Sequence, residues 1–484
     1  MNEVKYYSTN NKSESVNFET ALLNGMASNY GLYMMSRKDI PKLSKEEIAE
    51  MKDMSYSQIA FKVLILFLES DIPKPILKQL LDDAYDTNII PTKVQHVVGK
   101  TNIMWLTHGP TASFKDYAAR FFGRSLNYFL GKKELKRTVL VATSGDTGGA
   151  VADALYGLNN VNNIIFFPKG EVSEGQRRQM TTLGGNIYAF EVNGDFDVCQ
   201  ALAKNLLGDK KLAEDIFGDK DHFTSANSIS IGRLLPQAVY PFFAYSRVAK
   251  NGESVIMSIP SGNFGDMMGT VVAREMGLPI TKILCGVNEN TEFPVFLRTG
   301  IYKVDATKKS PSSAMNVSHP SNLARLIDFY GGHMYDERDP QTKKVVREGV
   351  IDTMPDLENM KEEISSESIS NSAHYETMRR VYEEFGIILD PHGAVGWKIL
   401  EDYSKGHHEH PGIVYETADP GKFPEDVKKA IGIIPELPER MKQQRDLPER
   451  IYSIDSKPEK TESGIKLSDA QIEEAKEKIA EIFS

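Results

Sequence analysis

The sequence is poor in cysteine and in long apolar runs, and each shortage argues against a class of protein. Among 484 residues there are two cysteines, Cys199 and Cys285, far apart and outside any cluster of metal ligands. A disulfide scaffold is therefore not expected, and we expect the protein to be located in the reducing cytoplasm. The longest apolar run, residues 63–68, is too short to cross a bilayer, and the polar N-terminus lacks the apolar core of a signal peptide. We expect no membrane partner.

An excess of basic residues is also missing. Lysine and arginine number 57 against 67 aspartates and glutamates, which gives a formal net charge of -10. We therefore expect no nucleic acid as a partner. A small anionic substrate stays compatible with this charge, because a pocket can be locally basic. A length of 484 residues predicts two to four domains.

The pattern of apolar residues changes near residue 100. The first 95 residues are mostly helical in pattern, and Ser44 with Glu47 fits a capping box at the start of a helix that reaches Leu68. After that, short β-branched or aromatic runs alternate with helical stretches. The predicted strands are residues 138–144, 164–168, 186–192, 254–260, 282–287 and 412–417. This alternation predicts βαβ units in mainly parallel sheets, with ligands at the carboxyl ends of the strands.

A lysine follows an apolar residue at the predicted start of a helix in HGPTASFKD, residues 108–116. Partial burial lowers the pKa of an amine and favours nucleophilic or Schiff-base chemistry at Lys115. The positive end of the helix acts in the same direction. The alternative is a solvated surface lysine, with Asp116 as the acidic residue of the first turn. When the segment is taken alone, this alternative is the preferred interpretation.

Two glycine-rich turns, residues 143–149 (TSGDTGG) and 261–266 (SGNFGD), each lie between a predicted strand and a predicted helix. Main-chain N–H groups at such turns bind carboxylate or phosphate, and glycine lets the ligand approach the backbone. A tight turn capped by serine and threonine is the alternative for either segment. Two such turns and a lysine are more informative together, because a cofactor phosphate and an amino-acid carboxylate need separate sites.

The three segments, in this order, resemble the threonine synthase family of fold-type II pyridoxal-phosphate enzymes. HGPTASFKDYA resembles the family's cofactor-lysine motif, VATSGDTGGAVADALYG its Ser-Gly-Asp-Thr-Gly loop, and IPSGNFGDMMGTVVAREMGLP its phosphate-binding loop. Further counterparts in the same order are VNFETALLNGMASNYGLYM, EGQRRQMTTLGGNIYAFEVNGDFDVCQALAK, NSISIGRLLPQAVYPF, HPSNLARL, LDPHGAVGW and ETADPGKFP. The resemblance spans roughly residues 5 to 440.

The resemblance implies an α/β fold like that of the tryptophan synthase β subunit, with two open, mainly parallel sheets flanked by helices and a helical N-terminal extension. The domains expected are a helical region at 1–95, a catalytic region at 96–440 with a smaller subdomain at about 116–200, and a charged helical tail at 441–484.

The resemblance also implies site residues. Pyridoxal phosphate is the expected cofactor, bound as a Schiff base to Lys115, with the hydroxyl of Thr417 against the pyridine nitrogen. The cofactor phosphate is expected at Gly262, Asn263, Phe264, Gly265 and Asp266. The substrate α-carboxylate is expected at Ser144, Gly145, Asp146 and Thr147, and the substrate phosphate at Asn227, Ser228 and Arg233. A salt bridge on a helix surface is the alternative for Arg233.

The implied reaction converts O-phospho-L-homoserine and water to L-threonine and phosphate, so the chain is expected to be a carbon–oxygen lyase acting on phosphate. A monomer or homodimer is expected, and no metal, although a histidine-rich stretch occurs at 407–410. Two alternatives stay open. One is a lyase that resembles threonine or serine dehydratase, and the other is a catalytically silent homologue that binds a phosphorylated ligand.

The sequence departs from the family pattern near the expected substrate site more than near the cofactor site. The departures are Asp195, Ser230, Ile231, Asn316 and Asp419. They put substrate preference in question, but not the cofactor.

Overall fold

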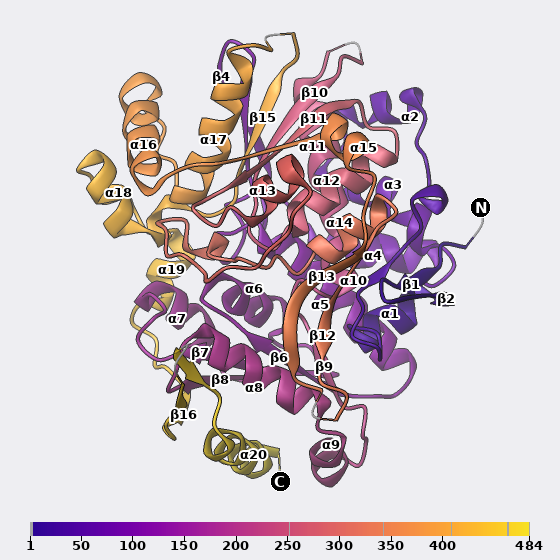
Figure 1. Cartoon of the computed structure of the whole chain (residues 1–484), viewed down its shortest axis with the longest axis vertical. Coiled ribbons are helices and arrows are strands. Elements are labelled where there is room, and N and C mark those ends of the chain that lie inside the picture. The colour runs from indigo at the N-terminus through magenta and orange to yellow at the C-terminus, as the bar shows by residue number, and fades with distance from the viewer. Residues whose placement is uncertain (1–2, 251, 342, 408, 462–463, 484) are drawn as a thin grey trace. The chain divides into compact units, whose positions relative to one another are not determined.

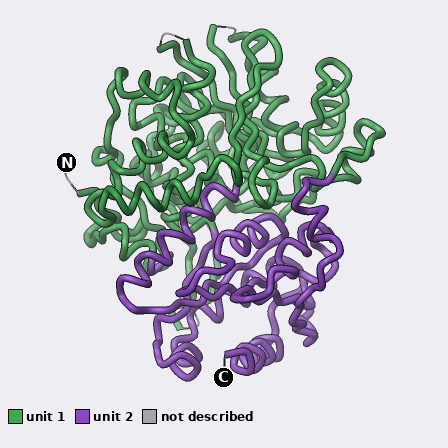
Figure 2. The backbone as a smooth tube through the Cα atoms, turned by 180° about the vertical axis from the view of Figure 1, so that it is seen from behind, with its two compact units in different colours: residues 1–22, 26–114, 228–436 green, residues 23–25, 115–227, 437–484 purple. Residues whose placement is uncertain are grey.

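The computed structural model of the protein describes residues 3–250, 252–341, 343–407, 409–461 and 464–483 (Figure 1). The chain forms two compact units, which Figure 2 shows in different colours. Unit 1 comprises residues 1–22, 26–114 and 228–436, and unit 2 comprises residues 23–25, 115–227 and 437–484. Each unit contains a sheet of its own.

The sheet of unit 1 has six strands in the order β14-β11-β10-β15-β5-β4. Their bounds are β14 Ile364–Ser368, β11 Ile280–Val287, β10 Val255–Pro260, β15 Gly412–Glu416, β5 Thr101–Trp105 and β4 Lys93–Val98. All neighbours pair in parallel except β4, which is antiparallel to β5 at the edge. Every residue of β10 and β15 is buried, as expected for central parallel strands covered on both faces.

Helices and a hairpin complete unit 1 around this sheet, and α17 packs against β10, β11 and β15. The helices are α1 Phe18–Asn24 (whose last two residues belong to unit 2), α2 Lys45–Ala49, α3 Tyr56–Leu68, α4 Lys74–Ala84, α10 Ile231–Leu234, α11 Val239–Val248, α12 Gly265–Glu275, α13 Glu292–Thr299, α14 Leu323–Phe329, α15 Leu357–Glu363, α16 Asn371–Phe385, α17 Pro391–Ser404 and α18 Pro424–Ile431. The hairpin joins β12 His333–Arg338 to β13 Val345–Thr353.

The N-terminal part of unit 1 differs from the sequence prediction in two respects. The capping box at Ser44 is confirmed, but α2 ends at Ala49 and a new helix, α3, begins after a second capping box at Ser55. The single helix predicted up to Leu68 is therefore wrong. The segment before it also contains a three-stranded sheet, β2-β1-β3, of β1 Tyr6–Ser8, β2 Asn11–Val16 and β3 Tyr33–Met34.

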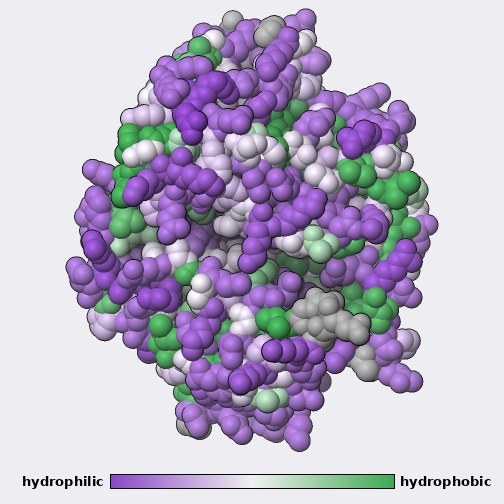
Figure 3. Space-filling view, turned by 60° about the vertical axis from the view of Figure 1, so that its left-hand side comes forward, coloured by the Kyte–Doolittle hydropathy of each residue, from purple (hydrophilic) through white to green (hydrophobic). Residues whose placement is uncertain are grey.

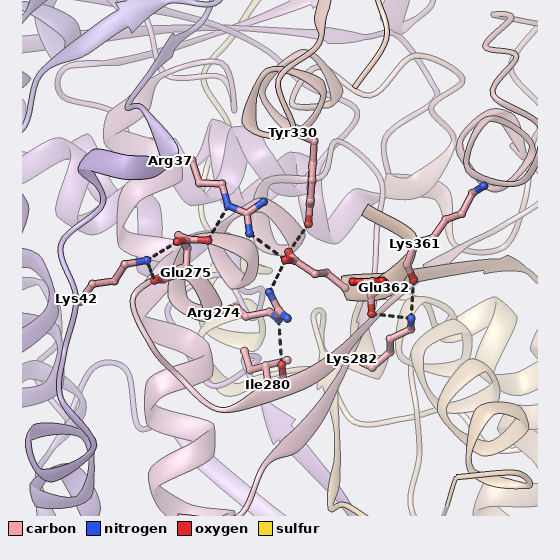
Figure 4. Close-up of polar contacts among 10 residues, drawn as sticks. Arg37, Lys42, Arg274, Glu275, Ile280, Lys282, Tyr330, Lys361 and Glu362 are labelled. Carbon is pink, nitrogen blue, oxygen red and sulfur yellow. Dashed lines mark hydrogen bonds and ion pairs between the residues drawn. The ribbon is translucent and has the colours of Figure 1, made fainter. Parts of the chain in front are cut away.

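A buried carboxylate ties this N-terminal part to the rest of unit 1. Glu363 accepts hydrogen bonds from Arg37 at 2.9 Å and from Tyr330 at 2.6 Å, and pairs with Arg274 at 2.8 Å. Arg37 also binds Glu275, which pairs with the exposed Lys42 (Figure 4). We call these six residues the Glu363 network.

The sheet of unit 2 has five parallel strands in the order β16-β8-β7-β6-β9. Their bounds are β16 Ile451–Ile454, β8 Ile187–Val192, β7 Val161–Pro168, β6 Arg137–Ala142 and β9 Phe223–Ser225. The helices of the unit are α5 Lys115–Lys132, α6 Asp146–Leu155, α7 Glu174–Thr181, α8 Phe196–Gly208, α9 Lys210–Phe217, α19 Glu439–Gln444 and α20 Asp469–Phe483. All six strands predicted from the sequence are confirmed. They are β6, β7 and β8 in unit 2 and β10, β11 and β15 in unit 1.

The C-terminal segment contributes strands as well as helices to unit 2. β16 extends the sheet beside β8, and β17 Glu459–Thr461 forms a small hairpin with β18 Gly464–Lys466. Ile454, Ala475 and Ile479 are buried in the core of this unit. The tail is therefore a packed part of unit 2.

Two observations concern the distribution of apolar residues. On the face drawn in Figure 3, hydrophobic residues form small separate patches among hydrophilic ones. Among the described residues, every helix is too short or too polar to cross a bilayer.

Candidate active site

Lys115 begins α5 in unit 2 and is largely buried. Its side chain is 15% exposed, and Nζ lies 3.7 Å from Oδ2 of Asp146. Asp146 is the first residue of α6, and its Oδ1 accepts a hydrogen bond of 2.9 Å from Nε2 of Gln176. The burial argues against a solvated surface lysine. The structure thus brings Lys115 together with the loop that follows β6.

The turn between β6 and α6 is held open by internal hydrogen bonds. The hydroxyl of Thr143 accepts from the N–H groups of Gly145 and Gly148, both at 2.9 Å. Gly145 has φ of 142°, and a Cβ there would lie 2.6 Å from the Gln176 side chain. The N–H groups of Ser144 and Thr147 donate no hydrogen bond to any described residue. These two donors are left for a ligand, whereas the N–H of Gly145 is used within the turn.

Asn227 ends the central segment of unit 2 beside the same strand. Its side-chain Nδ2 donates to the carbonyl of Ala142 at 3.4 Å, and its N–H donates to the hydroxyl of Ser225 at 3.3 Å. Asn227 is therefore fixed at the carboxyl end of β6, the strand that leads into the predicted substrate loop.

In unit 1, the predicted phosphate loop joins β10 to α12. Phe264 adopts a left-handed conformation with φ of 61°, and its ring packs on Phe293 at 4.9 Å between centroids. A Cβ at Gly262 would lie 2.7 Å from the carbonyl oxygen of Ala314, and one at Gly265 would lie 2.8 Å from Nε2 of Gln237. Neither position has room for a side chain.

The donors of this loop suit a phosphate. The N–H groups of residues 262–265 donate no hydrogen bond to any described residue, and they stand at the start of the 11-residue helix α12. Such a group of N–H donors, with the positive end of a helix dipole behind it, is a site for an anion. The carboxylate of Asp266 accepts from the N–H of Met267 at 2.9 Å and so caps the helix instead.

Thr417 lies at the same edge of the sheet as this loop. β10 and β15 are parallel neighbours with Ser258 opposite Val414, so Ser261 and Thr417 each come three residues after that pair. The carbonyl of Thr417 accepts from the N–H of Phe114, the residue before Lys115, at 2.9 Å. Its side-chain hydroxyl makes no hydrogen bond with a described residue. The phosphate loop and this hydroxyl fit the two ends of pyridoxal phosphate, its phosphate and its ring nitrogen.

The surroundings of the carboxyl group next to Thr417 disfavour its charged form. Burial raises the pKa of Glu416 well above its usual range, and the nearby charge of Asp390 adds to the effect. The N–H of Asp390 donates to Glu416 at 2.7 Å, and Gly393 leaves the space that the Glu416 side chain fills. The direction of this shift favours the protonated form of Glu416, which is a weaker partner for a protonated ring nitrogen than a carboxylate would be.

The predicted substrate-phosphate residues of unit 1 are buried or half-buried. Arg233 in α10 is 4% exposed, which removes the alternative of a salt bridge on a helix surface. The hydroxyl of Ser228 lies 3.1 Å from the hydroxyl of Ser321. Ser321 also donates to Oδ1 of Asn263 from both its N–H and its hydroxyl, at 3.2 Å each. Ser228 is thus joined to the phosphate loop through one serine.

Sequence reasoning assigned no role to Asn322 or Arg325. Asn322 donates from Nδ2 to the carbonyl of Asn263 at 2.9 Å, and Arg325 donates to Oδ1 of Asn322 at 2.6 Å. The signal was present in the segment HPSNLARL, because residues three apart on a helix lie on one face. Polar residues at that spacing directly after a proline could have identified the pair.

The departures from the family pattern have structural roles. Asp195 caps α8 through the N–H of Val198 at 3.0 Å, and Asp419 accepts from the N–H of Gly421 at 2.8 Å. Asn316 accepts from Asn288 at 2.9 Å. Ser230 and Ile231 are completely buried.

The histidine-rich stretch at 407–410 includes His408, which lies outside the described residues. Within the part of the chain that the structure describes, histidine, cysteine and acidic side chains form no group of three that could hold a metal ion.

Family models match most of the chain. The model for the threonine synthase N terminus matches residues 5–85, that for a pyridoxal-phosphate dependent enzyme residues 104–415, and that for the threonine synthase C-terminal region residues 393–465. The threonine synthase of Escherichia coli (strain K12) is 34% identical over 447 residues, which cover 92% of this chain and 95% of that protein.

Solved structures agree with this match. The crystal structure of pyridoxal-phosphate-bound threonine synthase from Brucella melitensis superimposes with a TM-score of 0.86 at 29% identity, over 99% of both chains. Yeast threonine synthase gives a TM-score of 0.84 at 29% identity, over 99% of this chain and 98% of that one. The predicted fold class, the pyridoxal-phosphate cofactor and the lyase class are confirmed by these matches. The chain therefore belongs to the threonine synthase family of pyridoxal-phosphate-dependent enzymes.

Proposed function

We propose that the protein converts O-phospho-L-homoserine and water to L-threonine and phosphate, in threonine biosynthesis. The observation that carries the proposal is the pairing, in each unit, of a chemical group with an anion-binding turn. Lys115 lies beside the turn at Ser144 in unit 2, and Thr417 lies on the same sheet edge as the phosphate loop in unit 1.

The cofactor would be held by Lys115 as a Schiff base, by the N–H groups of residues 262–265, and by Thr417 at the ring nitrogen. Asp266 contributes as the first-turn cap of α12. Bound there, pyridoxal phosphate supplies an electron-accepting ring that stabilises negative charge on substrate carbon atoms. A hydroxyl at the nitrogen, beside a carboxyl group whose pKa is raised, would leave that nitrogen without a carboxylate to stabilise its protonated form.

Substrate binding would use the remaining predicted residues. The N–H groups of Ser144 and Thr147 would bind the α-carboxylate, at the turn that Gly145 makes possible. The carboxylate of Asp146 cannot bind an anion, and it is suited instead to hold the amine of Lys115. The substrate phosphate would be bound by Asn227, Ser228 and Arg233, since a guanidinium binds phosphate through two parallel hydrogen bonds.

Lys115 would carry the proton transfers. Its ε-amino group, when free, would be a base that can take a proton from Cα and a proton from Cβ. The bond from Cγ to the phosphate oxygen breaks and phosphate leaves with the bonding electrons. A proton would be added to Cγ, which becomes the methyl group of threonine. The oxygen of a water molecule would bond to Cβ to give the hydroxyl, the proton of that water would pass to the ε-amino group, and Cα would regain a proton.

The compartment, the partners, the assembly and the domain division of the protein are also proposals. The protein is proposed to work in the cytoplasm on small molecules, as a monomer or homodimer and without nucleic acid, which the net charge of -10 and the two buried thiols support. The division into 1–95, 96–440 and 441–484 also stays a prediction.

The test is turnover of O-phospho-L-homoserine by the wild type and by Lys115→Ala, with phosphate and threonine both measured. We expect equimolar products from the wild type and almost none from the variant. Lys282→Ala is the matched control, because Lys282 is a half-buried lysine that donates to the carbonyl of Lys361 at 2.6 Å, away from the site. Release of ammonia from threonine in place of these products would identify a dehydratase. A wild type that never acquires the absorbance of bound cofactor would be a silent homologue.

A further inference from the structure

Arg325 is a fully buried arginine that pairs with no carboxylate among the described residues. Its side chain is 0% exposed, and its guanidinium donates to the carbonyls of Tyr33 at 3.0 Å, Ser228 at 3.3 Å and Ile229 at 2.6 Å, and to Oδ1 of Asn322 at 2.6 Å. All four acceptors are neutral. Burial lowers the pKa of Arg325 to about 9, which still leaves it charged at neutral pH. A buried charge without a counter-ion is costly, and an anion nearby would relieve the cost.

The carbonyls that Arg325 binds belong to the segment predicted to hold the substrate phosphate. In a trans peptide the C=O and the following N–H point in opposite directions. Holding the carbonyls of Ser228 and Ile229 on the guanidinium therefore turns the N–H groups of Ile229 and Ser230 away from it. These two N–H groups donate no hydrogen bond to any described residue. They are available to an anion on the far side of the segment.

The same arrangement extends to the cofactor loop through Asn322. The carbonyl of Asn263 accepts from the N–H of Asn322 at 3.3 Å and from its Nδ2 at 2.9 Å. That carbonyl is therefore turned toward Asn322, and the N–H of Phe264, across the same peptide, is turned toward the phosphate cradle. Because the Oδ1 of Asn322 is bound to Arg325, the orientation of this amide depends on the arginine.

We propose that Arg325 is a positioning residue for two phosphate sites, orienting the N–H groups of Ile229 and Ser230 directly and that of Phe264 through Asn322. Its charge, which no carboxylate neutralises, adds positive potential to both. The ligands are phosphate monoesters, the cofactor's at the loop and the substrate's at residues 228–230. The identity of the second ligand rests on the proposed function.

The test measures anion binding by apoprotein and requires no turnover. Pyridoxal phosphate is titrated to obtain its dissociation constant, and inorganic phosphate alone is tested for the rise it causes in the thermal midpoint. For Arg325→Gln we expect the dissociation constant to rise about tenfold or more, since hydrogen bonds to charged groups are lost, and most of the phosphate-induced rise to vanish. Arg325→Lys, with the charge but without the planar fork, should lie between.

Arg274→Gln is the matched control. Arg274 lies at the other end of the helix that begins at the cradle, and pairs with Glu363. This variant should lose stability while its dissociation constant for pyridoxal phosphate stays within about twofold of wild type. A merely structural arginine at 325 would behave in the same way, so wild-type affinity in folded Arg325→Gln overturns the proposal.

Asn322→Asp keeps the proposal open to refutation if Arg325→Gln does not fold. The aspartate retains an acceptor for Arg325 and gives it a counter-charge, but removes the donor to the carbonyl of Asn263. We expect a folded protein whose affinity for pyridoxal phosphate falls about tenfold or more. Wild-type affinity in this variant would refute the role of Arg325. If the wild type binds both anions but forms no threonine, the proposed reaction fails and the inference about Arg325 does not.

Discussion

Unit 1 contains two networks in which arginine side chains have different kinds of partner. In the Glu363 network, Arg37 and Arg274 both meet one buried carboxylate, and Tyr330 completes its hydrogen bonds. Around Arg325 the acceptors are carbonyl and amide oxygens, and the guanidinium keeps its full charge. The first arrangement is complete within the protein. The second leaves positive potential next to turns whose N–H groups donate to no residue that the structure describes.

The difference separates stability from function. A carboxylate between two guanidiniums fixes the N-terminal segment to α12 and α15, and it needs no ligand. An arginine without a counter-ion lowers the free energy of unfolding of the empty protein, and a bound anion raises it again. Substitutions in the two networks should therefore change different quantities, and each experiment below tests whether they do.

The largest effect is expected for Glu363→Ala. Removing this buried carboxylate leaves the half-buried Arg37 and Arg274 without their shared partner and the buried Tyr330 without its acceptor, which together cost about 3–5 kcal/mol in the free energy of unfolding. Denaturant unfolding measures this loss. The dissociation constant for pyridoxal phosphate, taken under conditions where the variant is folded, should stay at the wild-type value. Weaker cofactor binding by folded Glu363→Ala would show that the Glu363 network also affects ligand binding, and the proposed difference between the two networks would be wrong.

The next effect is expected for Gly262→Ala, on the ligand-binding side of the comparison. A Cβ there would meet the carbonyl oxygen of Ala314 at 2.7 Å. The loop must therefore shift, and its N–H groups would no longer point at the bound phosphate. We expect cofactor affinity to fall by about 1–3 kcal/mol, or roughly 5- to 150-fold. Gly208→Ala is the control, because a Cβ at that helix end would meet open space. Equal affinities in the two variants would show that the loop has no part in binding.

A smaller effect follows from the titration of Glu363. Burial alone would raise the pKa of Glu363, but hydrogen bonds from Tyr330 and Arg37 and the charge of Arg274 hold the pKa below its usual value. Near and below the ordinary glutamate pKa, the unfolded state therefore binds more protons than the folded state. The stabilisation is complete above about pH 4.3 and is lost as pH falls through the folded pKa.

The measurement is the free energy of unfolding against pH for the wild type and Glu363→Gln. We expect the difference between the two proteins to be constant from about pH 6 to 8 and to shrink toward pH 3. A difference that stays constant at acid pH would mean that the carboxylate is not held ionised by its arginines. Arg325 has no carboxylate partner, so its variants should show no such convergence between pH 3 and 6.

The comparison also shows what the sequence can and cannot predict. β6 and β10 were predicted because a continuous apolar run marks a strand buried on both faces, and that pattern is local. The helix predicted from Ser44 to Leu68 was wrong because a second capping box at Ser55 lies inside the apolar pattern. The strands β1 and β16 are too short to show a period of two, and the partner of β16, β8, lies far away in the chain.

The same limit applies to the candidate site. Lys115, the two glycine-rich turns and Thr417 lie in recognisable segments, so a resemblance of motifs could name them. The contacts of Asp146 with Lys115 and Gln176, and of Arg325 with residue 229, join positions some 30 to 100 residues apart. Nothing in the local pattern distinguishes such an arginine from one that pairs with a carboxylate, because the difference lies in what the fold places opposite it.

The smallest effect is expected for Lys42→Ala, at the exposed end of the Glu363 network. The side chain of Lys42 is 54% exposed where it meets Glu275, and exposed ion pairs contribute about 0–1 kcal/mol and are screened by salt. Arg37 lies closer to the buried carboxylate and binds both Glu275 and Glu363. Arg37→Ala should therefore cost more than Lys42→Ala, and its effect should persist at about 1 M salt, where the effect of Lys42→Ala disappears. Equal, salt-sensitive losses in both variants would show that Glu363 is effectively solvated, and the contrast with Arg325 would then rest on solvent access rather than on the presence of a counter-ion.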